Sequence, residues 1–175
     1  YYVTMEAEFG ISRIATLDTE DSHPARALGS VVLARADQPG LQYLSDLAGK
    51  RVAAVAPEAF GGYLVAAREM LGQGVDPESD LKEVHFVGLP MSRIVEAVQR
   101  GDVDAGIVRA CLPEQMVSQG EIRLEDFRIL SGRQDPDLPC ALSTRLYPNW
   151  PIAVTRQTDP VLAKAVARAL LAMPD

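Results

Sequence analysis

Lysine is scarce in this sequence, which has 17 basic residues but only three lysines, Lys50, Lys82 and Lys164. Acidic residues number 24, so the formal net charge is −7. A chain of this sign is poorly suited to the phosphate backbone of nucleic acids, and we expect no nucleic-acid partner. The excess of arginine over lysine has two explanations, the recognition of oxyanions or the base composition of the genome.

Long apolar runs and catalytic motifs are also missing. No stretch approaches the roughly 20 apolar residues that cross a bilayer, so no membrane span is predicted. There is no P-loop, no GxGxxG and no nucleophile elbow around Ser143, which argues against an enzyme and against a bound cofactor. The two histidines, His23 and His85, lie far apart without cysteines or carboxylates at metal-ligand spacing, so no metal site is predicted.

The remaining composition fits a folded α/β protein. The 175 residues, 47% of them hydrophobic and 23% charged, suffice for one domain or one and a half. Short apolar runs alternate with amphipathic segments, which indicates a mainly parallel α/β sheet. Strands are expected at 11–17, 28–35, 51–56, 83–87, 103–109 and 127–130. Helices are expected at 1–10, 92–100, 113–119 and 159–170. A further helix is expected after residues 61–62 and ends at residue 71.

Two local predictions bear on the function. Residues 61–62 form an expected tight turn before a helix whose inward face carries Leu64, Ala67 and Leu71. Residues 131–151 are expected to be irregular, and an irregular stretch of that length is usually functional or a crossing between lobes.

Three segments follow predicted strands, at 56–63, 88–92 and 109–113. Ligands of open α/β sheets bind beyond the carboxyl ends of the strands, where helix N-termini present unpaired N–H groups to anions. The alternating connectivity can bring these three segments to one edge of the sheet.

Two of these segments supply candidate ligand contacts. Backbone N–H groups of Phe60, Gly61, Gly62 and Tyr63 can hold an oxyanion, although a plain tight turn explains the same residues. Arg109 ends an apolar strand, where its guanidinium can bind a sulfonate or carboxylate through two hydrogen bonds. The alternative for Arg109 is a salt bridge to one of the many carboxylates of the protein.

Several longer stretches resemble a known family. Residues 44–52 (LSDLAGKRV) and 102–106 (DVDAG) resemble the phosphonate-binding-like branch of type 2 periplasmic solute-binding proteins. Residues 57–62 (PEAFGG) and 143–151 (STRLYPNWP) resemble the periplasmic sensor domains of bacterial histidine kinases, including tetrathionate sensors. The resemblance covers nearly the whole chain, 1–173.

This resemblance implies two α/β lobes joined by crossing strands, with a ligand clamped between them. It assigns 1–35 to a partial first lobe, 36–142 to a nearly complete second lobe, and 143–175 to a crossing segment with a return helix. An incomplete first lobe is expected to expose apolar surface, which makes a homodimer an expectation.

The function implied is that of a periplasmic ligand-sensing domain of a membrane-bound sensor histidine kinase in two-component signal transduction. It would be attached to the membrane through its parent chain and bind a small anionic solute in an interlobe cleft. The alternative is the solute-binding protein of an ABC transporter for a phosphonate or another oxyanion.

Four further residues join the candidate site. Tyr2 and Tyr147 offer aromatic walls or hydroxyl donors to a cleft, and for Tyr147 the alternative is hinge packing. Cys111, which lies close to Arg109, and Cys140 admit three interpretations. They form a structural disulfide in an oxidising compartment, or a redox-active or ligand-reactive pair whose state is itself the signal, or they never meet.

Overall fold

The computed structural model describes residues 2–18, 27–136 and 138–173. They divide into two compact units: unit 2 runs from Leu28 to Arg145, and unit 1 combines the residues up to Ala27 with those from Leu146 onward. Unit 2 is longer than the expected second lobe, 36–142, because the strand that precedes residue 36 pairs within its sheet. The two units are described separately below.

Unit 2 contains a five-stranded sheet in the order β4-β3-β5-β2-β6. Strand β3 pairs in parallel with β4 and β5, whereas β2 runs antiparallel to β5 and β6. The sheet is therefore mixed: β2 runs opposite to the other four strands, and the prediction of a mainly parallel sheet is wrong for β2 alone. Apolar periodicity finds a strand, but its direction depends on partners far away in the sequence. The strands are β2 (Ser30–Arg35), β3 (Arg51–Ala54), β4 (Glu83–Phe86), β5 (Ala105–Arg109) and β6 (Phe127–Ile129).

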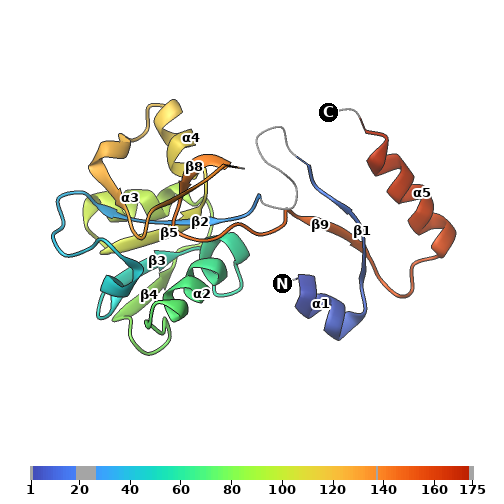
Figure 1. Ribbon diagram of the computed structural model, residues 1–175, viewed down its shortest axis with the longest axis horizontal. Helices are drawn as coiled ribbons and strands as arrows, with labels where there is room; N and C mark the ends of the chain where they lie inside the picture. The colour runs from blue at the N-terminus through green and yellow to red at the C-terminus, as the bar shows by residue number, and fades with distance from the viewer. Residues whose placement is uncertain (1, 19–26, 137, 174–175) are drawn as a thin grey trace. The chain divides into compact units, whose positions relative to one another are not determined.

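Helices cover both faces of this sheet (Figure 1). Helices α3 (Ser92–Arg100) and α4 (Leu112–Ser118) pack on one face, and α2 (Val65–Gly72) with the short helix η1 (Leu44–Leu47) packs on the other. Successive residues of β2 alternate between the two apolar cores, as expected for a central strand that is buried on both faces. The α/β fold class is thus confirmed.

Helix α2 begins differently from the prediction. A π-helical turn, η2 (Phe60–Leu64), leads directly into it, so the expected tight turn at residues 61–62 is absent. Leu64 and Leu71 are exposed, so the predicted inward face is wrong. A π turn holds more residues than an α turn, which rotates the positions that follow it around the helix axis. The side chains of α2 that are buried belong to Val65, Ala66, Glu69 and Met70.

The stretch 131–151 is more regular than predicted. It contains β7 (Arg133–Asp135) and β8 (Leu138–Leu142), which pair as an antiparallel two-stranded sheet. The strands are short, and β8 contains a proline, so the sequence gives little strand signal here. β8 leads into residues that lie beside β2, described below.

Unit 1 has a smaller sheet of its own. Strands β1 (Ser12–Thr16) and β9 (Pro151–Val154) pair antiparallel, and helices α1 (Tyr2–Phe9) and α5 (Pro160–Leu171) complete the unit. Helix α5 starts as predicted, because the Asp159 carboxylate accepts hydrogen bonds from the amides at the second and third positions after it.

The helices of unit 1 have no buried residue. The expected exposure of apolar surface is thus confirmed, while a homodimer stays a prediction. No helix in the described ranges has the length and apolarity needed to span a bilayer. The most exposed large apolar side chains of unit 1 are Val3, Phe9, Val161, Leu162, Leu171 and Met173.

Candidate functional site

Three segments far apart in the sequence meet at one edge of the unit 2 sheet. Arg109 ends β5 and pairs with Ser30, which begins β2. The Ser30 hydroxyl donates a hydrogen bond to the Gly61 carbonyl of η2, 2.7 Å away. A Cβ built on Gly61 would stand 3.9 Å from the Arg109 Cβ, so η2 lies directly against Arg109. The strand end, the strand start and the helical turn thus form one surface.

Glycine is required where η2 approaches β3. A Cβ on Gly62 would stand 2.5 Å from a methyl carbon of Val55, far inside normal contact. The Val55 amide in turn donates to the Gly62 carbonyl at 3.3 Å. Phe60, at the start of the turn, is half-buried. Because the first turn of a helix leaves its N–H groups without intrahelical partners, this turn can offer donors to an anion.

Arg109 is exposed and lies beside the start of α4. Its Nη2 donates to the Gln115 amide oxygen at 2.9 Å. This bond orients the guanidinium without neutralising its charge. No carboxylate of the described ranges forms an ion pair with it.

The two cysteines are joined in a disulfide. Cys111 and Cys140 have Cα atoms 5.1 Å apart across a sequence separation of 29 residues. The interpretation in which they never meet is therefore wrong; whether the bond is structural or reactive stays open. A second link runs beside it, because Glu114 Oε1 accepts a hydrogen bond from the Ala141 amide at 2.8 Å. Together the two links hold the start of α4 to β8.

The Tyr63 side chain belongs to a different part of the surface. Its ring packs edge-on against Phe86 with centroids 5.1 Å apart. Burial raises the pKa of the phenol, and the carboxylates of Glu78 and Asp76 raise it further. The hydroxyl group therefore lies on an acidic side of the unit, and only the backbone of Tyr63 suits an anion.

Tyr2 and Tyr147 belong to unit 1. The Tyr2 hydroxyl accepts a hydrogen bond from the Arg13 amide at 2.9 Å and donates to Glu6 at 3.2 Å, which joins α1 to β1. The Tyr147 carbonyl accepts a hydrogen bond from the Ala27 amide at 2.9 Å. A role for either tyrosine in a ligand site stays a prediction.

Buried hydroxyl groups next to the site were missed by sequence reasoning. Thr144 Oγ1 accepts a hydrogen bond from the Ser30 amide, and Ser143 Oγ accepts one from the Val32 amide, both at 2.9 Å. Ser30, Ser143 and Thr144 are all fully buried. Sequence reasoning considered Ser143 only as a nucleophile. Nothing in the sequence indicates that side-chain hydroxyl groups would accept hydrogen bonds from the backbone amides of β2.

Glu69 of α2 was also missed. Its side chain is 8% exposed, and Oε1 accepts hydrogen bonds from the Arg145 amide at 3.2 Å and the Arg145 Nε at 2.9 Å. Oε2 lies 3.9 Å from Nη2 of Arg133. Burial by itself would raise the pKa of this carboxyl, but the bonds from Arg145 outweigh burial and hold the pKa below its usual value.

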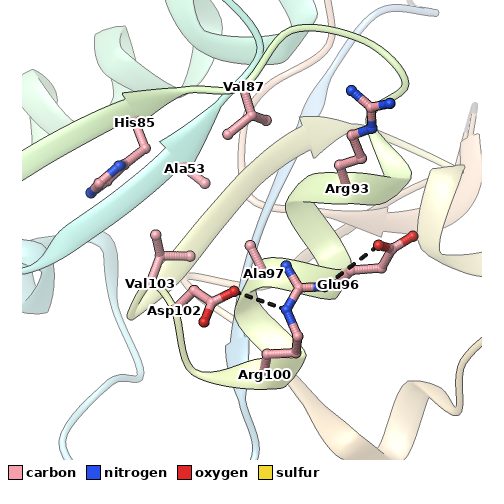
Figure 2. Close-up of a pocket in the computed structure, with 9 residues that line it drawn as sticks. All are labelled: Ala53, His85, Val87, Arg93, Glu96, Ala97, Arg100, Asp102 and Val103. Carbon is pink, nitrogen blue, oxygen red and sulfur yellow. Dashed lines mark hydrogen bonds and ion pairs between the residues drawn. The ribbon is translucent and has the colours of Figure 1, made fainter.

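A separate pocket of about 520 Å³ lies between α3 and the strands β3 and β4 (Figure 2). One of its two arginines is already paired, because Arg100 lies 3.6 Å from Glu96 and 2.8 Å from Asp102. None of the lining residues belongs to the surface formed by Ser30, η2 and Arg109. Its lining comprises Ala53, His85, Val87, Arg93, Glu96, Ala97, Arg100, Asp102 and Val103.

Only one of the two histidines, His85, is among the described residues, and it lies away from the Arg109 surface. His85 of β4 has its Nε2 3.0 Å from Glu83 Oε2. His23 falls outside the described residues. Within the described ranges, no group of three metal-ligating side chains is close enough to hold an ion.

Two other carboxylates of unit 2 are also held in their charged form. Hydrogen bonds from the Tyr43 and Gln42 amides lower the pKa of Asp46. Burial would raise the pKa of Asp104, but its hydrogen bonds and ion pair with Arg51 outweigh burial and lower it. Both groups therefore favour the folded state when ionised.

We expect unit 2 to lose stability in acid. Asp46, Glu69 and Asp104 have folded-state pKa values below those of the unfolded chain. Their contribution to stability is therefore complete above about pH 5 and is lost as the pH falls through the folded values. Urea unfolding between pH 7 and pH 2.5 measures this loss. Glu69→Gln should flatten the acid limb; an identical slope in wild type and variant would contradict the assignment.

The whole chain, residues 1–175, matches the family model described as "ABC transporter, phosphonate, periplasmic substrate-binding protein". The chain belongs to this family. The predicted recognition is therefore confirmed, and the chain is a member of a solute-binding family of periplasmic proteins.

A curated relative is the tetrathionate sensor histidine kinase TtrS of Salmonella typhimurium, 39% identical over 150 residues. The match covers 86% of this family member and 25% of TtrS. The chain thus spans about a quarter of the length of that kinase.

Solved structures share the fold. XAC2383 from Xanthomonas citri, bound to ATP, has a TM-score of 0.72 at 19% identity, covering 92% of this chain and 56% of that protein. PA3383 from Pseudomonas aeruginosa, a binding protein component of an ABC phosphonate transporter, has a TM-score of 0.57 at 16% identity, covering 88% of this chain and 47% of that one. The predicted periplasmic-binding-protein fold is confirmed by these matches.

Proposed function

We propose that the chain is the periplasmic ligand-sensing domain of a membrane-bound sensor histidine kinase. We also propose that it binds a small anionic solute at the edge formed by Ser30, Gly61 and Arg109. The similarity to TtrS supports the sensor role. Membrane attachment and kinase activity would belong to the rest of the parent chain.

The proposal of an anionic ligand rests on the exposed and charged side chain of Arg109. The side chain is exposed, its amide partner leaves the charge in place, and the η2 backbone lies against it. A guanidinium binds sulfonate, carboxylate or phosphonate oxygens in pairs, and N–H groups of a helical turn add directional donors. The site therefore suits one oxyanion group of a small ligand.

Tetrathionate is the first ligand to test, because it is named in the description of TtrS. One terminal sulfonate would contact Arg109 and the turn. A ligand that prefers one conformation by a few kcal/mol shifts a two-state equilibrium toward it. The expected closure of two lobes around the solute stays a prediction.

The alternative function is the solute-binding component of a transporter for a phosphonate or a similar oxyanion. The family description favours it. The residues before Gly61 do not favour a phosphonate. Phosphonate binders that resemble this chain have hydroxyl donors at this turn, whereas Glu58, Ala59 and Phe60 have none. Selectivity for phosphonates over sulfur oxyanions would favour the transporter.

Thermal unfolding with a panel of anions tests the proposal. Tetrathionate, thiosulfate, phosphate and a phosphonate are added to wild type, Arg109→Ala and the control Arg123→Ala, whose guanidinium is exposed and pairs with Glu125. A ligand at 100 times its Kd should stabilise wild type by about 2.7 kcal/mol. We expect Arg109→Ala to weaken the affinity about tenfold or more.

The control variant decides how a loss of binding is interpreted. Arg123→Ala should bind like wild type, because its charge lies in a surface loop. A ligand shift that is equal in all three proteins would contradict the role of Arg109. No shift with any anion would contradict an anionic ligand at this edge.

A further inference from the structure

Glu69 occupies a position where helix α2 meets the end of unit 2. Arg145 is the last residue of unit 2 and donates both its amide and its Nε to Glu69 Oε1. A buried carboxylate is costly unless it is paired and hydrogen-bonded. The inward neighbours of Glu69 on α2 are apolar, so packing alone does not require a charge at this position.

The residues just before Arg145 are held in the same region by β2. Ser143 donates its amide to the Ser30 carbonyl and accepts from the Val32 amide, each at 2.9 Å. Thr144 accepts from the Ser30 amide at 2.9 Å. Three consecutive residues are therefore fixed by side-chain hydrogen bonds, two of them to β2 and the third to α2.

The other end of α2 carries the candidate ligand turn. Helix α2 continues from η2 without a break, so Glu69 lies less than two helical turns beyond Leu64. Ser30 supplies a second connection, because its hydroxyl bonds to the Gly61 carbonyl while its amide bonds to Thr144. A displacement of η2 thus acts on residues 143–145 through two routes.

We propose that Glu69 is a positioning residue that couples η2 to the point where the chain leaves unit 2 at Arg145. Movement of the turn moves α2, and the carboxylate carries this movement to the amide and guanidinium of Arg145. The ligand that moves the turn rests on the proposed function. The coupling itself is a property of unit 2 and is measurable without a ligand.

Amide hydrogen exchange at Arg145 tests the contact directly. In wild type the Arg145 amide donates to a charged oxygen, so Glu69→Gln, which keeps only a neutral acceptor, should speed its exchange about tenfold. The control Glu96→Gln, on α3 and half-exposed, should leave it unchanged. The exchange of the buried Ile107 amide serves as the reference for overall stability.

A double-mutant cycle tests the coupling. Gly62→Ala forces η2 away from Val55 and should speed exchange at Arg145 several-fold, and by a clearly smaller factor in the Glu69→Gln background, where only the route through Ser30 remains. Ser30→Ala, which removes the bond to Gly61, replaces Gly62→Ala in the cycle if that variant does not fold. Equal factors in both backgrounds, or no effect of either turn variant at Arg145, would overturn the proposal.

Adding tetrathionate separates this proposal from the proposed function. We expect tetrathionate to change Arg145 exchange more in wild type than in Glu69→Gln, although the turn binds it in both. If tetrathionate binds and Arg145 responds equally in both proteins, the coupling through Glu69 is wrong. If it does not bind, the proposed ligand fails, and the cycle with Gly62→Ala alone decides the coupling.

Discussion

Removing the Cys111–Cys140 disulfide is expected to lower the free energy of unfolding of unit 2 by about 3–4 kcal/mol. The bond closes a loop with a sequence separation of 29 residues, and cross-linking a loop of this length restricts the unfolded chain by about that amount. The Cys111→Ala/Cys140→Ala double variant should therefore unfold about 10 °C lower than wild type.

Reductant supplies the control for this variant. Wild type treated with dithiothreitol should fall to the melting temperature of the double variant, and the variant should not respond to the reagent. A melting temperature that is unchanged by either treatment would show that the bond adds no stability. The reactive interpretation of the two cysteines would then gain support.

Gly106→Ala is expected to destabilise unit 2 by about 1–3 kcal/mol, because overpacking a core forces its neighbours apart. Gly106 is the second residue of β5, three residues before Arg109. A Cβ there would stand 2.6 Å from a methyl carbon of Ile94 and 2.9 Å from one of Val98. Helix α3 can approach the sheet this closely only because residue 106 has no side chain.

Two comparisons check the cause. Gly132→Ala is the matched control, since a Cβ at that position would meet its nearest neighbour at 3.5 Å, an ordinary contact. Val98→Ala in the Gly106→Ala background should cost less than the sum of the two single changes, because it removes one of the clashing methyl groups. Denaturant unfolding measures all four variants; additive losses would contradict the steric explanation.

Sequence reasoning succeeded where local chemistry decides the structure. The predicted start of α5 at Asp159–Pro160 is found, because an aspartate cap and a proline in the first turn act within a few residues. Helix α3 is also found at its predicted residues, 92–100, because the apolar residues Ile94, Val95 and Val98 recur at helical spacing. These features need no information about the rest of the chain.

Sequence reasoning failed where two different structures are compatible with the same local pattern of apolar residues. Apolar residues occur on more than one face of α2, and the π turn that selects the buried face leaves no mark in the spacing. The reversed direction of β2 likewise depends on partners far along the chain. Ser30 pairs with Arg109 of β5, and Leu33 pairs with Ile129 of β6.

The candidate site was also predicted only in part from the sequence. Arg109 and the residues 60–63 were predicted from strand ends and a glycine pair, and the structure brings their backbones together at one edge. The predicted contact of the Tyr63 backbone with a ligand stays a prediction, and the structure adds that its ring packs on Phe86, a partner that the local sequence does not indicate.

The sequence by itself determined the family, the alternation of strands and helices, and the charged residue at the end of β5, because composition, periodicity and motifs are local properties. Only the tertiary structure decided the mixed sheet, the disulfide and the contact of Glu69 with Arg145. Each of these joins residues distant along the chain, and a buried carboxylate or hydroxyl group acquires its partner only when the core around it is packed.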